Sequence, residues 1–222
     1  MRIFCDFDGT ISTVDTTDLV LGELADPAWE ALEARWRRSE ISAAQCMREQ
    51  IALIAADDET LNGVLDRVEI APGFVEFVAW CQAGGVPLTI VSDGVDGFIH
   101  RILRRHGLDH LPVVANRLAG DALAGRRLEQ PWSRAGCAGG SGVCKCQVVS
   151  ETVAPDDDLM VFIGDGRSDF CVANRADLLF ARDELAAHAR SRSMHHHEFS
   201  DFHQIATTLA ALQGRPARRT AI

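Results

Sequence analysis

The sequence predicts an α/β protein: a Rossmann-like, doubly wound, mostly parallel sheet with a small inserted helical cap and a short β-hairpin insertion. The first observation is a series of apolar runs that are short enough to be buried strands. They cover residues 3–5, 86–91, 113–115, 159–163 and 178–181. The second observation is that helix-like stretches lie between these runs, and strands that alternate with helices form parallel sheets through right-handed crossovers.

The first predicted strand is followed by a long segment in which no strand is expected. Trp29, Leu32 and Trp36 recur there at helical spacing, which is typical of a helix with one apolar face. We interpret this segment as a helical cap inserted after the first strand. The predicted division is a core of residues 1–14 and 72–214, a cap of residues 15–71 and a flexible tail of residues 215–222.

Helices are predicted between the later strands. One covers residues 72–82, beginning with a proline and followed by two glycines, and a second covers residues 95–106 and stops at a glycine. A third is expected over residues 145–154, and a fourth follows Asp165.

A β-hairpin is predicted over residues 113–132, where Gly120 and Gly125 separate short apolar runs as turn residues. Its edge would suit contact with a second copy of the chain, because an edge strand has unpaired backbone groups. We therefore consider a homodimer through this hairpin.

Composition argues against several kinds of function. The chain has 222 residues, a formal net charge of −10 and a pI near 5.2, whereas a nucleic-acid-binding surface needs a basic face. No apolar stretch approaches the ~18 residues that span a bilayer. The strand at residues 3–5 leaves no room for a signal peptide, and seven cysteines without an export signal indicate reduced thiols. We expect a cytoplasmic protein that binds neither nucleic acid nor a membrane.

Polar residues follow three of the predicted strands. They are Asp6 and Asp8 after the first, Ser92-Asp93-Gly94 after the second, and Asp165 and Asp169 after the strand at residues 159–163. In an open parallel sheet, ligands bind at the carboxyl ends of the strands. These side chains are therefore expected to meet at one edge of the sheet.

The residue types at that edge favour phosphoryl transfer. Asp6 and Asp8 alternate along an extended chain and point to opposite sides, so one carboxylate can attack phosphorus while the other handles the proton of the leaving oxygen. Because carboxylates repel a phosphate dianion, the site needs cations. Mg²⁺ prefers oxygen ligands, which Asp6, Asp165 and the Asp8 carbonyl would supply, and Asp169 would orient the metal's waters.

Lys145 is the only lysine in the chain. A lysine in a chain that otherwise uses arginine suggests a place where a compact ammonium is needed. We expect it to bind the phosphoryl oxygens together with Ser92 and the backbone N–H groups around Asp93 and Gly94. The sequence thus predicts a magnesium-dependent site for a small-molecule phosphomonoester.

These four motifs, in this order, resemble those of the haloacid-dehalogenase superfamily of aspartyl-phosphate phosphatases over nearly the whole chain. The resemblance implies Asp6 as the nucleophile, Asp8 as the general acid and base, Ser92 and Lys145 as phosphate ligands, and Asp165 and Asp169 at the magnesium. It also implies a helical cap between the first and second motifs. The presence of Asp8 and Asp165 argues against a dehalogenase and against a non-enzymatic scaffold.

Two branches of the superfamily are similar to this chain. Cys137-x6-Cys144-Lys145-Cys146 and Phe180-Ala181-Arg182-Asp183 resemble the methionine-salvage phosphatases, which act on 2-hydroxy-3-keto-5-methylthiopentenyl 1-phosphate. Asp169-Phe170-Cys171 resembles the phosphoethanolamine and phosphocholine phosphatases. Phosphoserine phosphatases have a glutamate near Asp15, where this chain has a side chain one methylene shorter. The resemblance is therefore taken to imply the methionine-salvage phosphate as the substrate, with phosphoethanolamine, phosphocholine and phosphoserine as the alternatives.

Some residues have two interpretations. Asp15 would face the leaving group and set substrate specificity, or it would cap the first cap helix. Trp29 and Trp36 would form the cap core, or an aromatic cage for choline. The sequence His195-His196-His197 is expected in a solvated loop.

Two alternatives to a hydrolase stay open. A cap that excludes water would make the same site a phosphotransferase or mutase. Cys137, Cys144 and Cys146, which flank the lysine, would bind zinc or respond to oxidation in a thiol- or metal-sensing regulator.

Overall fold

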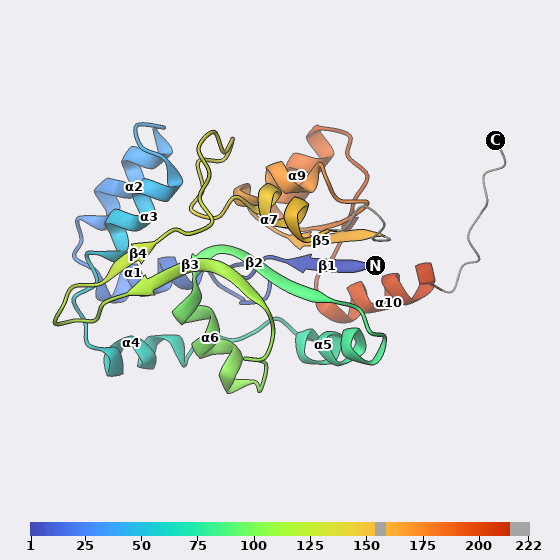
Figure 1. Cartoon of the computed structure of the whole chain (residues 1–222), viewed down its shortest axis with the longest axis horizontal. Helices are drawn as coiled ribbons and strands as arrows, with labels where there is room; N and C mark the ends of the chain where they lie inside the picture. Colours follow the sequence, from blue (N-terminus) through green and yellow to red (C-terminus); the bar gives the residue numbers. More distant parts are fainter. Residues whose placement is uncertain (154–158, 214–222) are drawn as a thin grey trace.

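The computed structural model describes residues 1–153 and 159–213 of the chain, and these form one seven-stranded sheet in the order β4-β3-β2-β1-β5-β6-β7 (Figure 1). The strands are β1 (Arg2–Cys5), β2 (Leu88–Val95), β3 (Val113–Ala119), β4 (Arg127–Glu129), β5 (Met160–Gly164), β6 (Leu178–Ala181) and β7 (His197–Glu198). Only β4 runs antiparallel to its neighbour in this described sheet. The predicted mostly parallel α/β fold is confirmed.

The central strands are apolar because helices cover both of their faces. Ile3 and Cys5 of β1 belong to one buried cluster, and Phe4 between them belongs to the other. Every residue of β5 and β6 is buried. A strand that is buried on both faces has a continuous apolar run instead of an alternating one, which explains why the runs in the sequence locate these strands.

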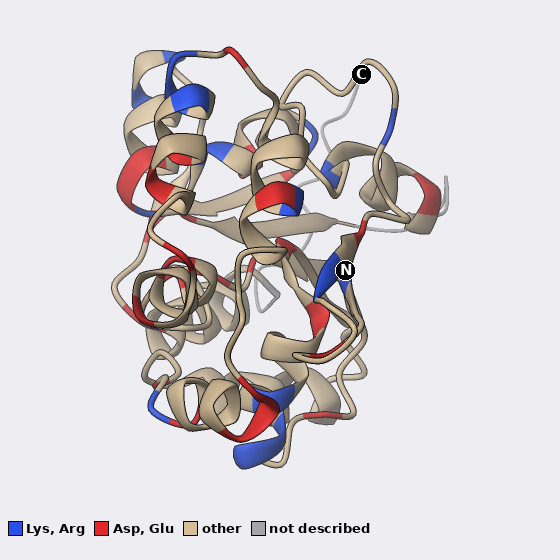
Figure 2. Ribbon diagram, turned by 90° about the vertical axis from the view of Figure 1, so that its left-hand side faces the viewer, with Lys and Arg blue, Asp and Glu red and all other residues tan. Residues whose placement is uncertain are grey.

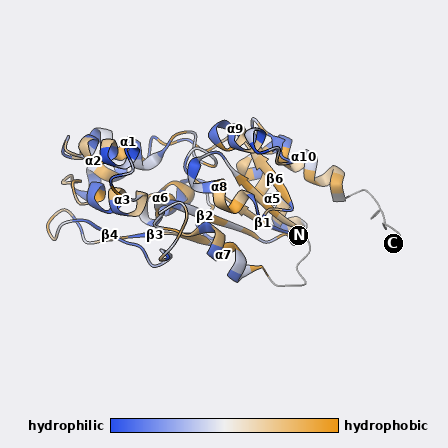
Figure 3. Ribbon diagram, turned by 90° about the horizontal axis from the view of Figure 1, so that it is seen from above, coloured by the Kyte–Doolittle hydropathy of each residue, from blue (hydrophilic) through white to orange (hydrophobic). Residues whose placement is uncertain are grey.

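The two faces of the sheet have different helices (Figure 1). On one face, residues of α5 (Phe74–Ala83), α6 (Asp96–Arg105) and α10 (Phe202–Gln213) join the larger apolar cluster. On the other face, α7 (Lys145–Thr152), α8 (Phe170–Ala173) and α9 (Asp183–Ser191) contribute to the smaller one. Figure 3 shows apolar residues gathered around the strands and α10.

The segment between β1 and α5 is helical, as predicted. It contains α1 (Thr16–Leu24), α2 (Trp29–Arg37), α3 (Ala43–Ile51) and α4 (Asp58–Leu65). An isolated antiparallel bridge joins Ser12 to Ile70, so the chain leaves the core and returns to it at adjacent points, as an insertion does. Helix α2 contains no buried residue. The division into core and cap at residues 15 and 71 stays a prediction.

The predicted hairpin is present, and the cap covers part of it. Strands β3 and β4 pair antiparallel, with Gly120 and Gly125 at positive φ between them. The side chain of Arg126 is buried and donates hydrogen bonds to the carbonyl oxygens of Ile54 and Ala56 and, at 2.6 Å, to Asp58 Oδ1. The hairpin therefore braces the cap, and its use in a homodimer stays a prediction.

Three predicted boundaries differ from the structure. Strand β2 begins after Pro87, which has no N–H to donate, and it continues through an irregular register to Val95. The expected helix after Asp165 is a 3₁₀ turn, η1 (Arg167–Asp169), followed by the four-residue α8. His197 lies in β7 instead of a loop, where its ring stacks on Phe180 at 5.3 Å and its backbone pairs with β6.

Residue 154 of the third predicted helix and the tail at residues 215–222 lie outside the described residues. Within the described ranges, every helix is too short or too polar to cross a membrane. In Figure 2 basic and acidic residues are interspersed over the elements in view. The predicted absence of nucleic-acid partners stays a prediction.

Candidate active site

Asp6, directly after β1, lies at the centre of the site. Its Oδ1 accepts a hydrogen bond from the backbone N–H of Phe7 at 2.7 Å, and its Oδ2 lies 2.6 Å from the ammonium of Lys145. The Asp6 side chain is 7% exposed and that of Lys145 is fully buried. The predicted meeting of these two residues is observed, and it fixes the orientation of the Asp6 carboxylate.

Lys145 uses its ammonium to hold three groups together. Besides Asp6, its Nζ contacts Asp169 Oδ1 at 2.6 Å and donates to Ser168 Oγ at 3.0 Å. Burial lowers the pKa of Lys145, but the charges of Asp169 and Asp6 outweigh that effect and raise it above its ordinary value. The ammonium thus neutralises buried carboxylates.

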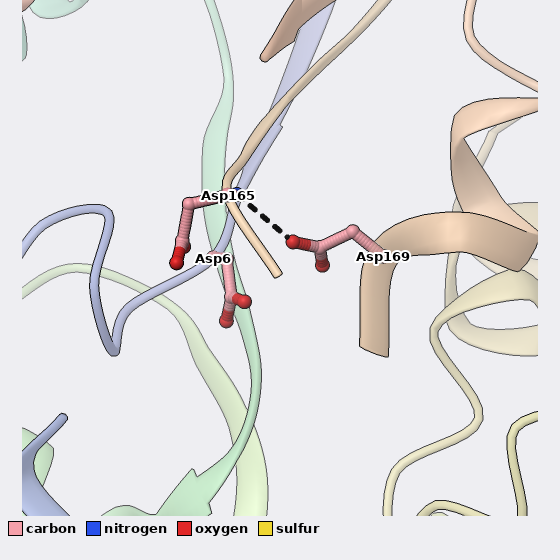
Figure 4. Close-up of side chains that lie close together, drawn as sticks. All are labelled: Asp6, Asp165 and Asp169. Carbon is pink, nitrogen blue, oxygen red and sulfur yellow. Dashed lines mark hydrogen bonds between the residues drawn. The ribbon is translucent and has the colours of Figure 1, made fainter. Parts of the chain in front are cut away.

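Asp165 and Asp169 complete an acidic cluster with Asp6, and their carboxylates come from different sides of it (Figure 4). Asp169 Oδ2 accepts hydrogen bonds from the N–H groups of Asp165 at 3.1 Å and Gly166 at 3.2 Å. Since its Oδ1 contacts Lys145, both oxygens of the Asp169 carboxylate already have partners in the chain. Asp165 accepts a hydrogen bond from the hydroxyl of Thr10.

The acidic cluster is short of positive charge. Burial and, second to it, the charge of Asp6 together raise the pKa of Asp169 to about 8 and that of Asp165 to about 7, although Lys145 lowers both. Ligand atoms of these three aspartates lie within 4.8 Å of one another. Carboxylate oxygens this close, with one lysine among them, fit a hard divalent cation. No other group of at least three His, Cys, Asp or Glu side chains in the described residues is close enough to hold a metal, so the zinc site considered at Cys137, Cys144 and Cys146 is not formed.

Asp8 points away from the acidic cluster, toward the first turn of α1. Its Oδ1 accepts hydrogen bonds from the backbone N–H of Thr16 at 2.9 Å and from the Thr16 hydroxyl. Burial raises the pKa of Asp8 to about 6, although the Thr16 hydrogen bonds lower it. A carboxyl group with a pKa near neutrality can give and take a proton under physiological conditions.

The segment at the end of β2 closes the site beside Asp8. Ser92 is buried, and its Oγ accepts a hydrogen bond from the N–H of Gly94 at 2.9 Å. A Cβ at Gly94 would collide with the Asp8 carboxylate, so a glycine is required there. The Asp93 carboxylate instead accepts a hydrogen bond from the N–H of Val143 at 2.9 Å. Asp93 therefore ties β2 to the segment before α7, and its predicted contact with phosphate stays a prediction.

Asp15 fits both of its interpretations. It is the N-cap of α1, and its Oδ1 accepts a hydrogen bond from the N–H of Asp18 at 2.9 Å. It also lines a cavity of about 1810 Å³ that contains Asp6, Asp8 and Asp165 on its core side. The specificity role of Asp15 stays a prediction.

The opposite wall of this cavity comes from α2, α3 and residues 134–141. Trp36 of α2 is half-buried there, and the guanidinium of Arg167 lies 5.7 Å from the centre of its ring. Trp29 packs against the main apolar cluster. The prediction that both tryptophans form the cap core is therefore right for Trp29 and wrong for Trp36. The Trp36 ring instead faces the guanidinium of Arg167, which lies on the opposite side of the cavity.

Sequence reasoning missed a second basic side chain at the site. Arg182 donates hydrogen bonds to the carbonyl oxygens of Gly9 and Thr10 and so fixes the loop that follows Asp6. A Cβ at Gly9, which has φ +69°, would collide with Asp165. Arg182 directly follows the apolar run at residues 178–181. Asp6 and Asp165 were predicted at the site because polar residues at the carboxyl ends of parallel strands meet at one edge of the sheet, and the same reasoning applies to Arg182.

Comparison with known proteins is consistent with this geometry. The family model described as haloacid dehalogenase-like hydrolase matches residues 3–174. The chain is 31% identical over 216 residues to a protein of Brevibacillus brevis named 2-hydroxy-3-keto-5-methylthiopentenyl-1-phosphate phosphatase, covering 95% of this chain and 96% of the relative. A Geobacillus thermodenitrificans protein of the same name is 32% identical over 217 residues, with 95% and 96% coverage.

Solved structures show the same fold. A substrate-bound phosphoserine phosphatase complex has a TM-score of 0.65 at 20% identity, covering 93% of this chain and 97% of that one. A phospho-aspartyl intermediate analogue of phosphoserine phosphatase has a TM-score of 0.64 at 19% identity, with the same coverage. At this identity the likeness concerns the fold alone.

Proposed function

We propose, since the chain belongs to the haloacid dehalogenase-like hydrolase family, that it is a Mg²⁺-dependent phosphatase of small phosphomonoesters. Its substrate is 2-hydroxy-3-keto-5-methylthiopentenyl 1-phosphate, the compound in the names of relatives that are 31% and 32% identical over 95% of the chain. This match over nearly the whole chain is the observation on which the substrate assignment rests. The Asp6–Lys145–Asp169 contacts support the reaction class.

The two aspartates of the first loop divide the reaction between them. Asp6, held by Lys145 and the Phe7 N–H, attacks phosphorus and forms an aspartyl-phosphate. Asp8 protonates the leaving oxygen, and its carboxylate then removes a proton from the water that hydrolyses the intermediate. The Thr16 hydrogen bonds hold Asp8 apart from Asp6, which supports this separation of roles.

Asp6 and Asp165 would hold the Mg²⁺, and Asp169 would position them. When bound, the ion supplies positive charge that offsets the repulsion between the carboxylates and the phosphoryl oxygens. Lys145 and the N–H groups around Ser92 would contribute the remaining charge and donors.

The cavity wall suits a substrate that is polar at one end and apolar at the other. Trp36 and Met47 offer apolar surface for a thioether tail, whereas Asp15 offers an acceptor for a hydroxyl group. A cationic amine is the other group that Asp15 would accept, and phosphoethanolamine, phosphocholine and phosphoserine therefore belong among the compounds tested.

The test measures phosphate release with Mg²⁺ from the methylthiopentenyl phosphate, phosphoethanolamine, phosphocholine and phosphoserine. p-Nitrophenyl phosphate serves as the generic ester. We expect the methylthiopentenyl phosphate to have a kcat/KM at least tenfold above every other compound. A higher kcat/KM for one of the amines would overturn the substrate. Release only in the presence of a second acceptor would make the protein a phosphotransferase, and no release from any ester by protein that binds Mg²⁺ would overturn the reaction.

A further inference from the structure

One buried polar side chain lies directly behind the segment at the end of β2. Asn116, in β3, is fully buried. Its amide nitrogen donates hydrogen bonds to the backbone carbonyl oxygens of Asp93 at 2.5 Å and Gly94 at 3.3 Å. It also contacts Asp93 Oδ1 at 3.3 Å and Met47 Sδ at 3.6 Å. Because carbonyl oxygens only accept hydrogen bonds, the nitrogen of the amide must face this segment.

The Asn116 side chain replaces part of the sheet ladder where β2 becomes irregular. Strand β2 pairs with β3 at Val91 and again at Val95, which lies opposite Asn116, and the register shifts between these two points. Residues 92–94 therefore bulge out of the ladder, and their backbone groups need other partners. The Asn116 amide is such a partner, so it gives the bulged segment a defined shape.

The anchored carbonyl group also fixes the donor on the other side of the same peptide. The C=O of Asp93 and the N–H of Gly94 belong to one planar trans peptide unit and point in opposite directions. Since Asn116 holds the C=O, the N–H is directed away from it and donates to Ser92 Oγ at 2.9 Å. A hydroxyl oxygen that accepts this bond keeps its own proton to donate. The Ser92 proton is thus left for a phosphoryl oxygen.

Asn116 also lies against the segment that leads to Lys145. A Cβ at Gly142 would come within 2.4 Å of Asn116 Oδ1, so a glycine is required at this close approach. The next N–H, that of Val143, donates to Asp93 Oδ1 at 2.9 Å, the same oxygen that the Asn116 amide contacts. The two side chains expected to bind phosphate are therefore connected through Asn116 and Asp93.

We propose that Asn116 is a positioning residue, which sets the Ser92 hydroxyl for the phosphoryl group without touching the substrate. The inference rests on the proposed function, since it needs a phosphoryl group beside Ser92. In the described chain Ser92 and Gly94 line the cavity, whereas Asn116 lies behind them. Without the amide donor, the peptide between Asp93 and Gly94 is free to rotate, and its N–H no longer orients Ser92.

The loss should weaken binding more than it slows the chemical step, because Ser92 contacts the phosphoryl group in the bound substrate as well as in the transition state. The experiment measures the Kd of inorganic phosphate with Mg²⁺ by isothermal titration calorimetry, and kcat and KM for p-nitrophenyl phosphate. For Asn116→Leu, which is similar in size but has no donor, we expect Kd and KM to rise about tenfold, as for the loss of one hydrogen bond to a charged group. We expect kcat to change less than about threefold.

Two further variants test whether the donor is responsible. Asn116→Ser keeps one donor and should give a Kd between those of Asn116→Leu and the wild type. Asn62→Leu, in α4 and outside the cavity, makes the same substitution elsewhere and should leave Kd unchanged. Thermal unfolding checks that each variant is folded, and the serine variant keeps the test valid if the leucine variant is not.

A double-mutant cycle with Ser92→Ala separates positioning from a general loss of stability. If Asn116 acts through the Ser92 hydroxyl, Asn116→Leu should raise the phosphate Kd of the Ser92→Ala protein by less than about twofold. The full tenfold rise in that background, or a lower kcat with an unchanged Kd, would overturn the positioning role. Wild-type protein that neither binds phosphate nor hydrolyses p-nitrophenyl phosphate would instead overturn the proposed function, and this role with it.

Discussion

Lys145 shows at the scale of one residue how the site is balanced. Its fully buried ammonium contacts Asp6 and Asp169, each at 2.6 Å. A buried charge pair adds little stability in itself, but removal of one partner leaves the other charge uncompensated. The lysine is therefore needed to keep the carboxylates ionised and close together, in addition to any contact with phosphate.

We predict that Lys145→Met lowers the free energy of unfolding by about 3–5 kcal/mol at pH 8, the usual effect of removing one partner of a buried pair. The loss should be smaller at pH 5.5, because the pKa values of Asp165 and Asp169, about 7 and 8, leave these groups protonated there. Urea unfolding at both pH values measures this. Adding Asp169→Asn should recover part of the loss, and an equal loss at both pH values would contradict the argument.

We also predict that Asp6→Asn lowers kcat by on the order of 10⁴-fold or more, as expected when a covalent nucleophile is removed. The variant should still fold, because asparagine keeps the acceptor for the Phe7 N–H. Asp57→Asn is a matched control, since Asp57 is the exposed N-cap of α4 and asparagine caps helices equally well. Turnover by Asp6→Asn near the wild-type rate would rule out the aspartyl-phosphate.

At the scale of elements, the hairpin and the cap stabilise each other through Arg126. Its buried guanidinium satisfies two carbonyl oxygens after α3 and pairs with Asp58 at 2.6 Å. The hairpin therefore positions the cap, and with it the cavity wall opposite Asp6.

Arg126→Ala should accordingly lower the free energy of unfolding by about 2–4 kcal/mol, because it leaves buried carbonyls unpaired and removes a charged hydrogen bond. Arg127→Ala should change the free energy of unfolding by less than about 0.5 kcal/mol. Arg127 is exposed, and its ion pair with Glu129 is long, at 3.9 Å, and solvent-screened. Chemical denaturation of both variants makes the comparison. Similar effects of the two substitutions would contradict a bracing role.

Helix α2 contacts the core side of the cavity through the Trp36–Arg167 pair. An exposed cation–π contact contributes about 0.5–1 kcal/mol, so Arg167→Gln should raise KM about twofold to fivefold. We expect kcat to change little, because Arg167 contacts none of the catalytic carboxylates among its described partners. Arg104→Gln, at an exposed ion pair with Asp109 on α6, should leave KM unchanged. An unchanged KM in Arg167→Gln would mean that the pair does not position the cap.

At the scale of the whole molecule, the site makes stability depend on pH and on metal. The pKa values of Asp8, Asp165 and Asp169 are raised above 3.8 to about 6, 7 and 8, chiefly by burial. The folded protein then binds more protons than the unfolded chain between pH ~4 and ~8, so the contribution of these groups to stability falls as the pH rises through that range.

Mg²⁺ should oppose this effect because it competes with protons for the same oxygens. With ion at about 100 times its Kd, binding adds about 2.7 kcal/mol, which corresponds to a rise in Tm of about 5–10 °C for a chain of this size. Differential scanning calorimetry with Mg²⁺ or with EDTA should show this rise at pH 8 and a much smaller one at pH 5. An equal rise at both pH values would place the ion elsewhere.

Much of the architecture and of the site follows from local patterns in the sequence. The buried strands β1, β5 and β6 are continuous apolar runs, and Asp6 and Asp165 were identified because each follows such a run. The least predictable elements were those with mixed or polar composition. The end of β2 contains Ser92 to Gly94, and β7 contains His197, so neither has the apolar signal of a strand; backbone pairing with neighbours decides both.

Local patterns in the sequence are enough to predict the fold class, the edge of the sheet where the site lies and the carboxylates that gather there. Periodicity and strand ends are properties of residues close together in the chain, and the rules of parallel sheets convert them into positions. The side-chain partners, by contrast, follow from tertiary packing: Lys145 with Asp169, Arg126 with the cap, and Arg182 with the loop after Asp6. Such contacts depend on how helices cross the sheet and pack, and residues as many as 173 positions apart meet as a result.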